Sequence, residues 1–212
     1  MSKMNLPNKL TLMRIIFVPF FVLFMALPLR FGVWSRWGAL IIYVMASITD
    51  ALDGHIARSR NMITNFGKIM DPLADKLLVS SGFVMLTSIG VIPGFITAIV
   101  LFRDFTVSSL RMFAVNKKHD VAASWSGKVK TVFQMVGIVL GIFLVASQSE
   151  YTKMFNFIYV PIENLFSFYS IVNFIMSICI VGAAITTIWS LWDYFMRFKS
   201  DINVEEWFYI GR

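Results

Sequence analysis

The sequence predicts an all-α integral membrane protein, with six transmembrane helices and a polar, metal-lined cavity on the cytoplasmic side. Three observations support this fold class. Of the 212 residues, 58% are hydrophobic and only 15% are charged, a composition far from that of ordinary soluble proteins. Six apolar runs follow one another, each near the roughly 20 residues that a helix needs to cross about 30 Å of hydrocarbon. Four aspartates interrupt two of these runs.

The apolar runs define the expected helices in chain order. They lie at about Leu10–Leu29, Trp37–Arg58, Phe66–Ile89, Ile92–Val115, Val129–Ser147 and Phe166–Phe195. The first is expected to be a retained helix rather than a signal peptide, because FMALPLRFG offers no small-residue cleavage site. Segment 148–164 is mixed and aromatic, which favours a position at the membrane interface. No repeat or linker divides the chain, so residues 1–212 are expected to form one domain.

The distribution of positive charge predicts the orientation. Most of the 19 Lys and Arg would fall on the side that holds both termini, whereas the opposite side would hold Arg30, Arg36 and Lys153. The positive-inside rule therefore places both termini in the cytoplasm. The same rule, together with anionic phospholipid, explains the net charge of +7 better than nucleic acid, which is not an expected partner. The single cysteine, Cys179, excludes an internal disulfide.

The four aspartates form two pairs on neighbouring predicted helices. Asp50 would lie about 20 Å and Asp75 about 21 Å from the outer ends of their helices, so the pairs are expected at one level, with Arg103 at about 17 Å. Asp50 and Asp53 are about 60° apart around the first helix. Asp71 and Asp75 are about 40° apart around the second. Because a short turn joins these helices, antiparallel packing would bring the two acidic faces together.

Four carboxylates gathered in a membrane would repel one another unless concentrated positive charge lay among them. A divalent ion is the natural occupant, since all-oxygen ligation suits Mg²⁺, Mn²⁺ or Ca²⁺ and disfavours Zn²⁺. His55 lies far around the helix from the aspartates and is not an expected ligand. A merely solvated helix face is disfavoured, because 4 of the 12 Asp and Glu occupy one 26-residue window. The predicted metal ligands are Asp50, Asp53, Asp71 and Asp75.

The same stretch resembles the signature of the CDP-alcohol phosphatidyltransferases, DxxDGxxAR followed after eight residues by GxxxDxxxD. Its fixed positions are filled here by Asp50, Asp53, Gly54, Ala57, Arg58, Gly67, Asp71 and Asp75. The resemblance implies a membrane enzyme, often a homodimer, whose first three aspartates hold Mg²⁺ or Mn²⁺, two ions in all, on the pyrophosphate of a CDP-linked alcohol. It also implies that Asp75 is the general base. The residues implied to bind CDP are Asp53, Gly54, Ala57, Arg58 and Gly67.

Two further segments bear on the acceptor alcohol. The stretch NLPNKLTLMRI, with Asn8, Thr11 and Arg14, resembles the bacterial branch of the family that makes phosphatidylglycerophosphate. So do RDFTVSSLRMF and SWSGKVKTVFQM. The sequence departs from the family pattern at Asp104, where glutamate often follows the arginine. Aspartate keeps the charge and shortens the reach.

Four cations toward the cytoplasmic ends of the fourth and fifth predicted helices are expected to form an anion pocket beside the metals. They are Arg103, Arg111, Lys128 and Lys130. Burying an arginine within a membrane costs free energy, so the two arginines indicate a functional role. Anchoring by the positive-inside rule explains Lys128 and Lys130 equally well. With the resemblance, the pocket implies phosphatidyl transfer from CDP-diacylglycerol to glycerol 3-phosphate, at the cytoplasmic face of the plasma membrane.

Two alternatives stay open. Another acceptor within the family would be phosphatidylglycerol, serine or inositol phosphate, and the first two would make little use of a phosphate pocket. From a different class, four membrane acids would also suit a cation channel or transporter. That reading predicts metal flux in liposomes without CDP-lipid, and it leaves the glycines and Arg58 unexplained.

Overall fold

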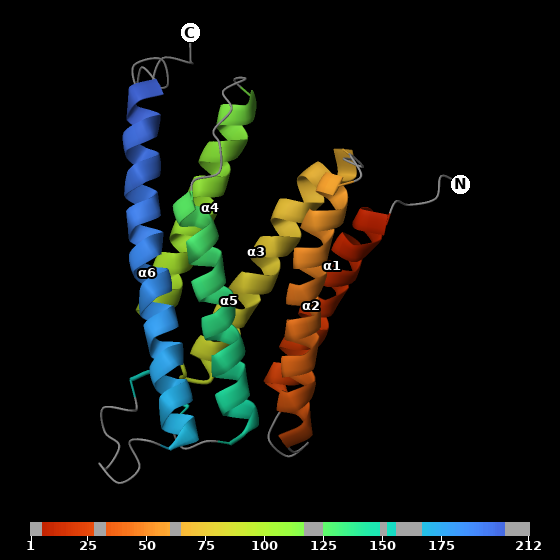
Figure 1. Ribbon diagram of the computed structural model, residues 1–212, viewed down its shortest axis with the longest axis vertical. Coiled ribbons are helices and arrows are strands. Elements are labelled where there is room, and N and C mark those ends of the chain that lie inside the picture. The colour runs from red at the N-terminus through yellow and green to blue at the C-terminus, as the bar shows by residue number, and fades with distance from the viewer. Residues whose placement is uncertain are drawn as a thin grey trace.

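The computed structural model describes residues 6–27, 33–59, 65–116, 125–148, 152–155 and 167–201. Within these ranges all regular structure is helical, as predicted, and six helices follow one another (Figure 1). They are α1 (Leu6–Ala26), α2 (Val33–Ser59), α3 (Asn65–Ser88), α4 (Gly94–Asn116), α5 (Trp125–Ala146) and α6 (Phe168–Asp201). The main difference from the predicted bounds is α6, which continues six residues past Phe195.

The helices form two groups that α3 connects. On one side α1 packs along α2, and on the other α6 packs along α5 and contacts α4. Helix α3 lies obliquely between them, with contacts to α1 and α2 and also to α4 and α5 (Figure 1). A further contact between α2 and α5 closes the bundle.

The core fills the space where these groups meet. Tyr43 of α2, Phe83 of α3, Ile138 of α5 and Met176 of α6 are each fully buried. The ring of Tyr43 also packs on that of Phe21 of α1, with 5.1 Å between the ring centroids. Side chains from five helices therefore hold the bundle together, mainly by apolar packing.

Two glycines on one face of α5 allow its neighbours to approach closely. A Cβ added at Gly137 would lie 2.6 Å from Cδ1 of Ile180 in α6. One added at Gly141 would lie 2.9 Å from Cδ1 of Leu86 in α3 and 3.4 Å from Sδ of Met176 in α6. Their spacing of four residues is the small-xxx-small pattern that brings helices together in membranes.

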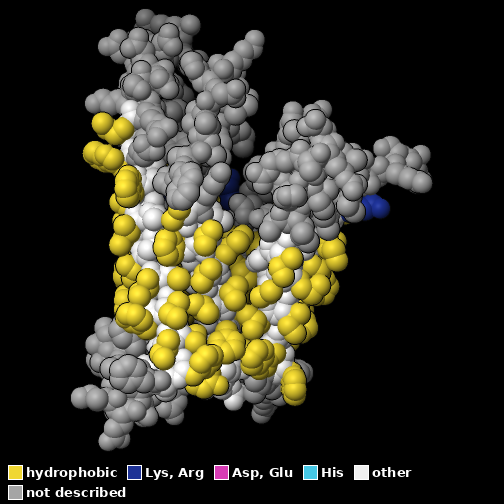
Figure 2. All heavy atoms as spheres, in the orientation of Figure 1, with side chains coloured by type: hydrophobic (Ala, Val, Ile, Leu, Met, Phe, Trp, Pro, Cys, Tyr) yellow, Lys and Arg dark blue, Asp and Glu magenta, His cyan; other side chains and the backbone are white. Residues whose placement is uncertain are grey.

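In the part of the chain that the structure describes, two helices are long and apolar enough to cross a bilayer, judged by length and composition. The stretches are Val129–Ala146 in α5 and Phe168–Trp192 in α6. Thr11–Ala26 and Lys76–Ser88 are apolar over shorter lengths. Hydrophobic side chains cover most of the described part of the visible face, and its Lys and Arg side chains lie near the upper margin of this band (Figure 2). That all six helices span the membrane remains a prediction.

Candidate functional site

The two aspartate pairs lie on either side of the segment that joins α2 and α3. Asp53 is six residues before the end of α2, and Asp71 is six residues after the start of α3. Each is therefore about 9 Å along its helix from the connection. Asp50 and Asp75 lie about one turn further away on the same helices. The helix bounds thus put the two pairs at similar distances from the connection.

The side chains that carry the predicted donor site fall outside the described residues. These are the side chains at Asp50, Asp53, Ala57, Arg58, Asp71 and Asp75, while Gly54 and Gly67 lie in the same helical stretches. Among the side chains that are described, no group of three or more His, Cys, Asp or Glu could hold a metal ion. The convergence of the four carboxylates stays a prediction. Its donor set, carboxylate oxygen alone, fits Mg²⁺ or Mn²⁺.

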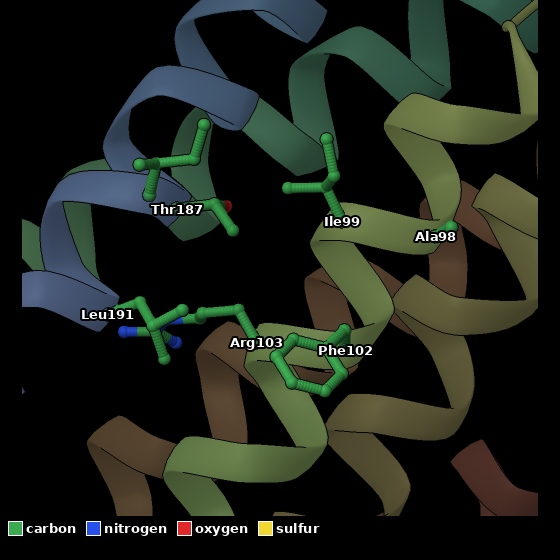
Figure 3. Close-up of a pocket in the computed structure, with 7 residues that line it drawn as sticks. Ala98, Ile99, Phe102, Arg103, Thr187 and Leu191 are labelled. Carbon is green, nitrogen blue, oxygen red and sulfur yellow. The ribbon is translucent and has the colours of Figure 1, made fainter. Parts of the chain in front are cut away.

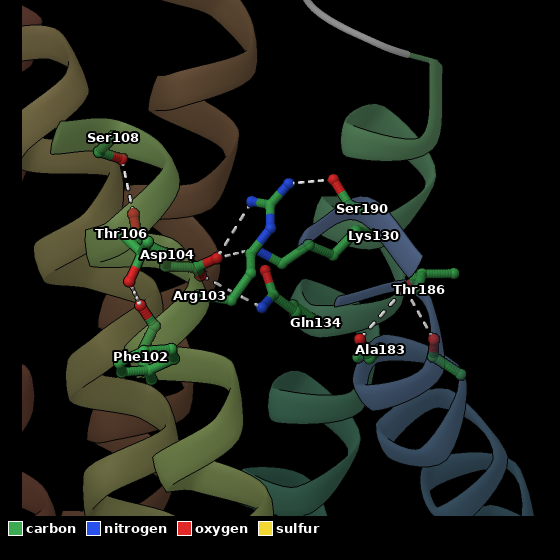
Figure 4. Close-up of polar contacts among 11 residues, drawn as sticks. Phe102, Arg103, Asp104, Thr106, Ser108, Lys130, Gln134, Ala183, Thr186 and Ser190 are labelled. Atoms are coloured by element: carbon green, nitrogen blue, oxygen red, sulfur yellow. Dashed lines mark hydrogen bonds and ion pairs between the residues drawn. The ribbon is translucent and has the colours of Figure 1, made fainter. Parts of the chain in front are cut away.

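A polar cluster joins α4, α5 and α6 around one carboxylate (Figure 4). It consists of Arg103, Asp104, Lys130, Gln134 and Ser190. The Lys130 ammonium donates to Oδ1 of Asp104, and Gln134 Nε2 lies 3.4 Å from Oδ2. Arg103 Nη1 donates to Oδ1 of Asp104 at 3.3 Å, and its Nη2 donates to the Ser190 hydroxyl. Two cations and one carboxylate leave this cluster with a formal charge of +1.

The structure brings together two of the four cations predicted for the acceptor pocket. Arg103 is 8% and Lys130 4% exposed, and they meet at Asp104, the position where the sequence departs from the family pattern. The side chains of Arg111 and Lys128 lie outside the described residues. Phosphate binding by all four therefore stays a prediction.

Sequence reasoning missed Gln134 and Ser190, and it singled out Asp104 only as a departure from the family pattern. Gln134 follows Lys130 by one helical turn, so its place on the same face of α5 was available from spacing. Ser190 carried no such signal, because its part depends on how α6 packs against α4.

Two members of the N-terminal motif are buried in α1. Thr11 and Arg14 are each 1% exposed, three residues apart on one helix face. Asn8 lies in α1, but its side chain is outside the described residues. Because α1 contacts both α2 and α3, the motif belongs to the helix that packs against both aspartate-bearing helices.

A cavity of about 400 Å³ lies between α4 and α6, next to the polar cluster (Figure 3). Its lining consists of Ala98, Ile99, Phe102, Arg103, Thr187, Ile188 and Leu191. Arg103 belongs to both the cavity and the cluster. The Thr187 hydroxyl is buried and has no hydrogen-bond partner among the described residues. Otherwise the lining is almost wholly apolar, which suits hydrocarbon better than a polar ligand.

Residues 4–189 match the family model described as CDP-alcohol phosphatidyltransferase. The chain belongs to the CDP-alcohol phosphatidyltransferase family. The match begins before α1 and ends inside α6, so it takes in both aspartate pairs and all members of the polar cluster except Ser190. CDP-alcohol phosphatidyltransferases generally use divalent metal ions.

Curated relatives lie within the same family. A protein of Bacillus subtilis (strain 168), named CDP-diacylglycerol–glycerol-3-phosphate 3-phosphatidyltransferase, is 38% identical over 143 residues, which are 63% of this chain and 74% of the relative. Proteins with that name from Escherichia coli (strain K12) and Shigella boydii serotype 4 (strain Sb227) are 41% identical over 141 residues, with the same coverage. The family prediction made from the acidic signature is confirmed.

Proposed function

We propose that this protein transfers a phosphatidyl group from CDP-diacylglycerol to sn-glycerol 3-phosphate, giving phosphatidylglycerophosphate and CMP in phospholipid biosynthesis. The observation that carries the proposal is its identity of 38–41% with relatives named for this reaction. The complete acidic signature on α2 and α3 supports the donor half of the reaction. The cations of α4 and α5 support a phosphorylated acceptor.

On the donor side, the aspartates of α2 and α3 would bind divalent ions, and Arg58 would pair with a phosphate of CDP. Gly54, Ala57 and Gly67 would leave room for the nucleotide beside the helices. When bound, Mg²⁺ or Mn²⁺ would neutralise charge on the pyrophosphate and on the departing CMP. The proposed metal ligands are Asp50, Asp53, Asp71 and Asp75.

The reaction proceeds by attack of an acceptor hydroxyl on the phosphatidyl phosphorus. A new bond forms between the hydroxyl oxygen and this phosphorus, and the bond from phosphorus to the bridging oxygen of CMP breaks. Asp75 accepts the hydroxyl proton. General-base catalysis of this kind typically raises the rate roughly 10²- to 10⁴-fold. Arg103, Arg111, Lys128 and Lys130 would hold the acceptor phosphate.

The same proposal includes the setting of the enzyme. All six helices cross the plasma membrane, and both termini face the cytoplasm. The site opens to the cytoplasm, which supplies glycerol 3-phosphate and receives the released CMP. The charge distribution supports this orientation, and the apolar spans of α5 and α6 support the membrane location. The active form is proposed to be a homodimer.

The test is to supply purified protein with CDP-diacylglycerol, Mg²⁺ or Mn²⁺, and one acceptor at a time, and to identify the lipid product by mass spectrometry. The acceptors are glycerol 3-phosphate, inositol phosphate, serine and phosphatidylglycerol. Phosphatidylglycerophosphate and CMP are expected with the first. A product from another acceptor alone would overturn the substrate assignment. Divalent-cation flux in liposomes without CDP-lipid, together with no product from any acceptor, would refute the assignment as an enzyme.

A further inference from the structure

Asp104 is the point at which the buried cations of α4 and α5 meet. Its carboxylate accepts from Lys130, Arg103 and Gln134. We propose that Asp104 is a positioning residue, which holds Lys130 and Arg103 where they bind the phosphate of the acceptor alcohol. This inference rests on the proposed function and adds a residue to it that contacts the binding cations rather than the substrate.

Burial explains why these cations need an anion. Arg103 and Lys130 are both more than nine-tenths buried, where like charges repel more strongly than in water. A carboxylate between them offsets this repulsion and supplies an acceptor to each, without which a buried charge is strongly destabilising.

The geometry explains why the carboxylate fixes the position of Lys130. Lysine carries its charge on a flexible four-carbon chain, so an ammonium without a fixed partner samples many positions. Gln134, one turn further along α5, donates to the other oxygen of Asp104 and so restrains the carboxylate on both sides. An ammonium has three N–H donors, which is more than the contact with Asp104 uses. Such preorganisation lowers the entropy cost of binding.

Arg103 extends the same restraint to α6. One terminal nitrogen of its guanidinium donates to Asp104 and the other to Ser190. The planar group is therefore held between α4 and α6 before any phosphate arrives. The short side chain at position 104 keeps the carboxylate close to α4, and the long side chains of Lys130 and Gln134 span the distance from α5.

The experiment measures KM for glycerol 3-phosphate and kcat in four variants. Asp104→Asn keeps the shape and removes the charge, Asp104→Glu restores the charge, and Lys130→Met and the double variant D104N/K130M complete a cycle. Loss of a charged hydrogen bond predicts a rise in KM of about tenfold to a hundredfold in D104N, with kcat changed less. Asp104→Glu should recover most of that loss. The KM of the double variant should rise by less than the product of the two single effects, because Asp104 acts in part through Lys130 and in part through Arg103.

Three outcomes would overturn the positioning role. They are an unchanged KM in D104N, independent multiplication of the two single effects in the double variant, and a fall in kcat with every acceptor while KM stays constant. The last is the mark of a purely structural role. If D104N fails to fold, Gln134→Met tests the restraint on the Asp104 carboxylate without changing charge. A KM for glycerol 3-phosphate within twofold of wild type would then refute the positioning role.

Two controls separate this inference from the proposed function. If the wild-type protein makes no phosphatidylglycerophosphate, the proposed function is refuted. If the wild type is active and D104N has the same KM for glycerol 3-phosphate, only the positioning role is refuted. Ser109→Ala is the matched control on α4, because the Ser109 hydroxyl is exposed and donates to the carbonyl of Phe105 in its own helix. Its KM and kcat should equal those of wild type.

Discussion

The contact between α3 and α5 leads to a prediction about Gly141→Ala. Its effect on the free energy of unfolding should change sign when Leu86 is also replaced. Leu86 of α3 is fully buried, and a Cβ added at Gly141 would lie 2.9 and 3.3 Å from its two methyl carbons. Both distances are shorter than ordinary van der Waals contact. Gly141→Ala should therefore strain the wild-type protein but fit the space left by Leu86→Ala.

The magnitudes follow from competing terms. Forcing a methyl group into a packed core costs roughly 1–3 kcal/mol, while replacing glycine by alanine within a helix returns about 1 kcal/mol. Gly141→Ala should thus lower the free energy of unfolding by about 1 kcal/mol in the wild type. Leu86→Ala alone should lower it by about 2–5 kcal/mol. In the Leu86→Ala background, Gly141→Ala should instead raise it by about 1 kcal/mol, because the remaining contact at 3.4 Å is with the flexible Met176.

The assay is reversible unfolding in mixed micelles with increasing sodium dodecyl sulfate, monitored by circular dichroism. Leu77→Ala is the matched control, because this leucine of α3 is 39% exposed, and it should change the free energy by less than about 1 kcal/mol. Equal effects of Gly141→Ala in both backgrounds would refute the reasoning, since they would mean that Leu86 does not occupy the space beside Gly141.

Three further predictions concern the proposed reaction. Asp75→Asn should nearly abolish turnover while CDP-diacylglycerol binding with metal survives, and retention of more than about a tenth of wild-type activity would exclude Asp75 as the base. Excess EDTA should stop product formation, and added Mg²⁺ or Mn²⁺ should restore it; full activity in the chelator would remove the metal from the reaction. Arg111→Ala should mainly raise KM for glycerol 3-phosphate, and a KM equal to that of wild type would take Arg111 out of the acceptor pocket.

Much of the helical framework could be predicted, because apolar runs near 20 residues admit few other structures in a chain of this composition. The end of α6 could not be placed in the same way. Hydropathy reports transfer into hydrocarbon, whereas the helix continues to Asp201 through residues such as Arg197 and Lys199, which are good helix formers. Hydropathy and helix propensity therefore predict different helix ends where polar residues begin.

The candidate site was predictable where it depends on spacing within one helix. The aspartate pairs and the pair of Lys130 and Gln134 follow from positions three or four residues apart. The role of Asp104 did not follow, because it depends on which faces α4, α5 and α6 turn toward one another. Helix packing of that kind is set by side-chain shape across the bundle, and sequence period alone does not specify it.

The glycine face of α5 has a consequence for assembly. In membrane proteins, small residues four apart often join two separate chains. Here Gly137 and Gly141 already receive Ile180, Leu86 and Met176 of the same chain. A second copy that docks on the described part of the chain therefore cannot use this glycine pair, and its contacts must come from other side chains on the outside of the bundle.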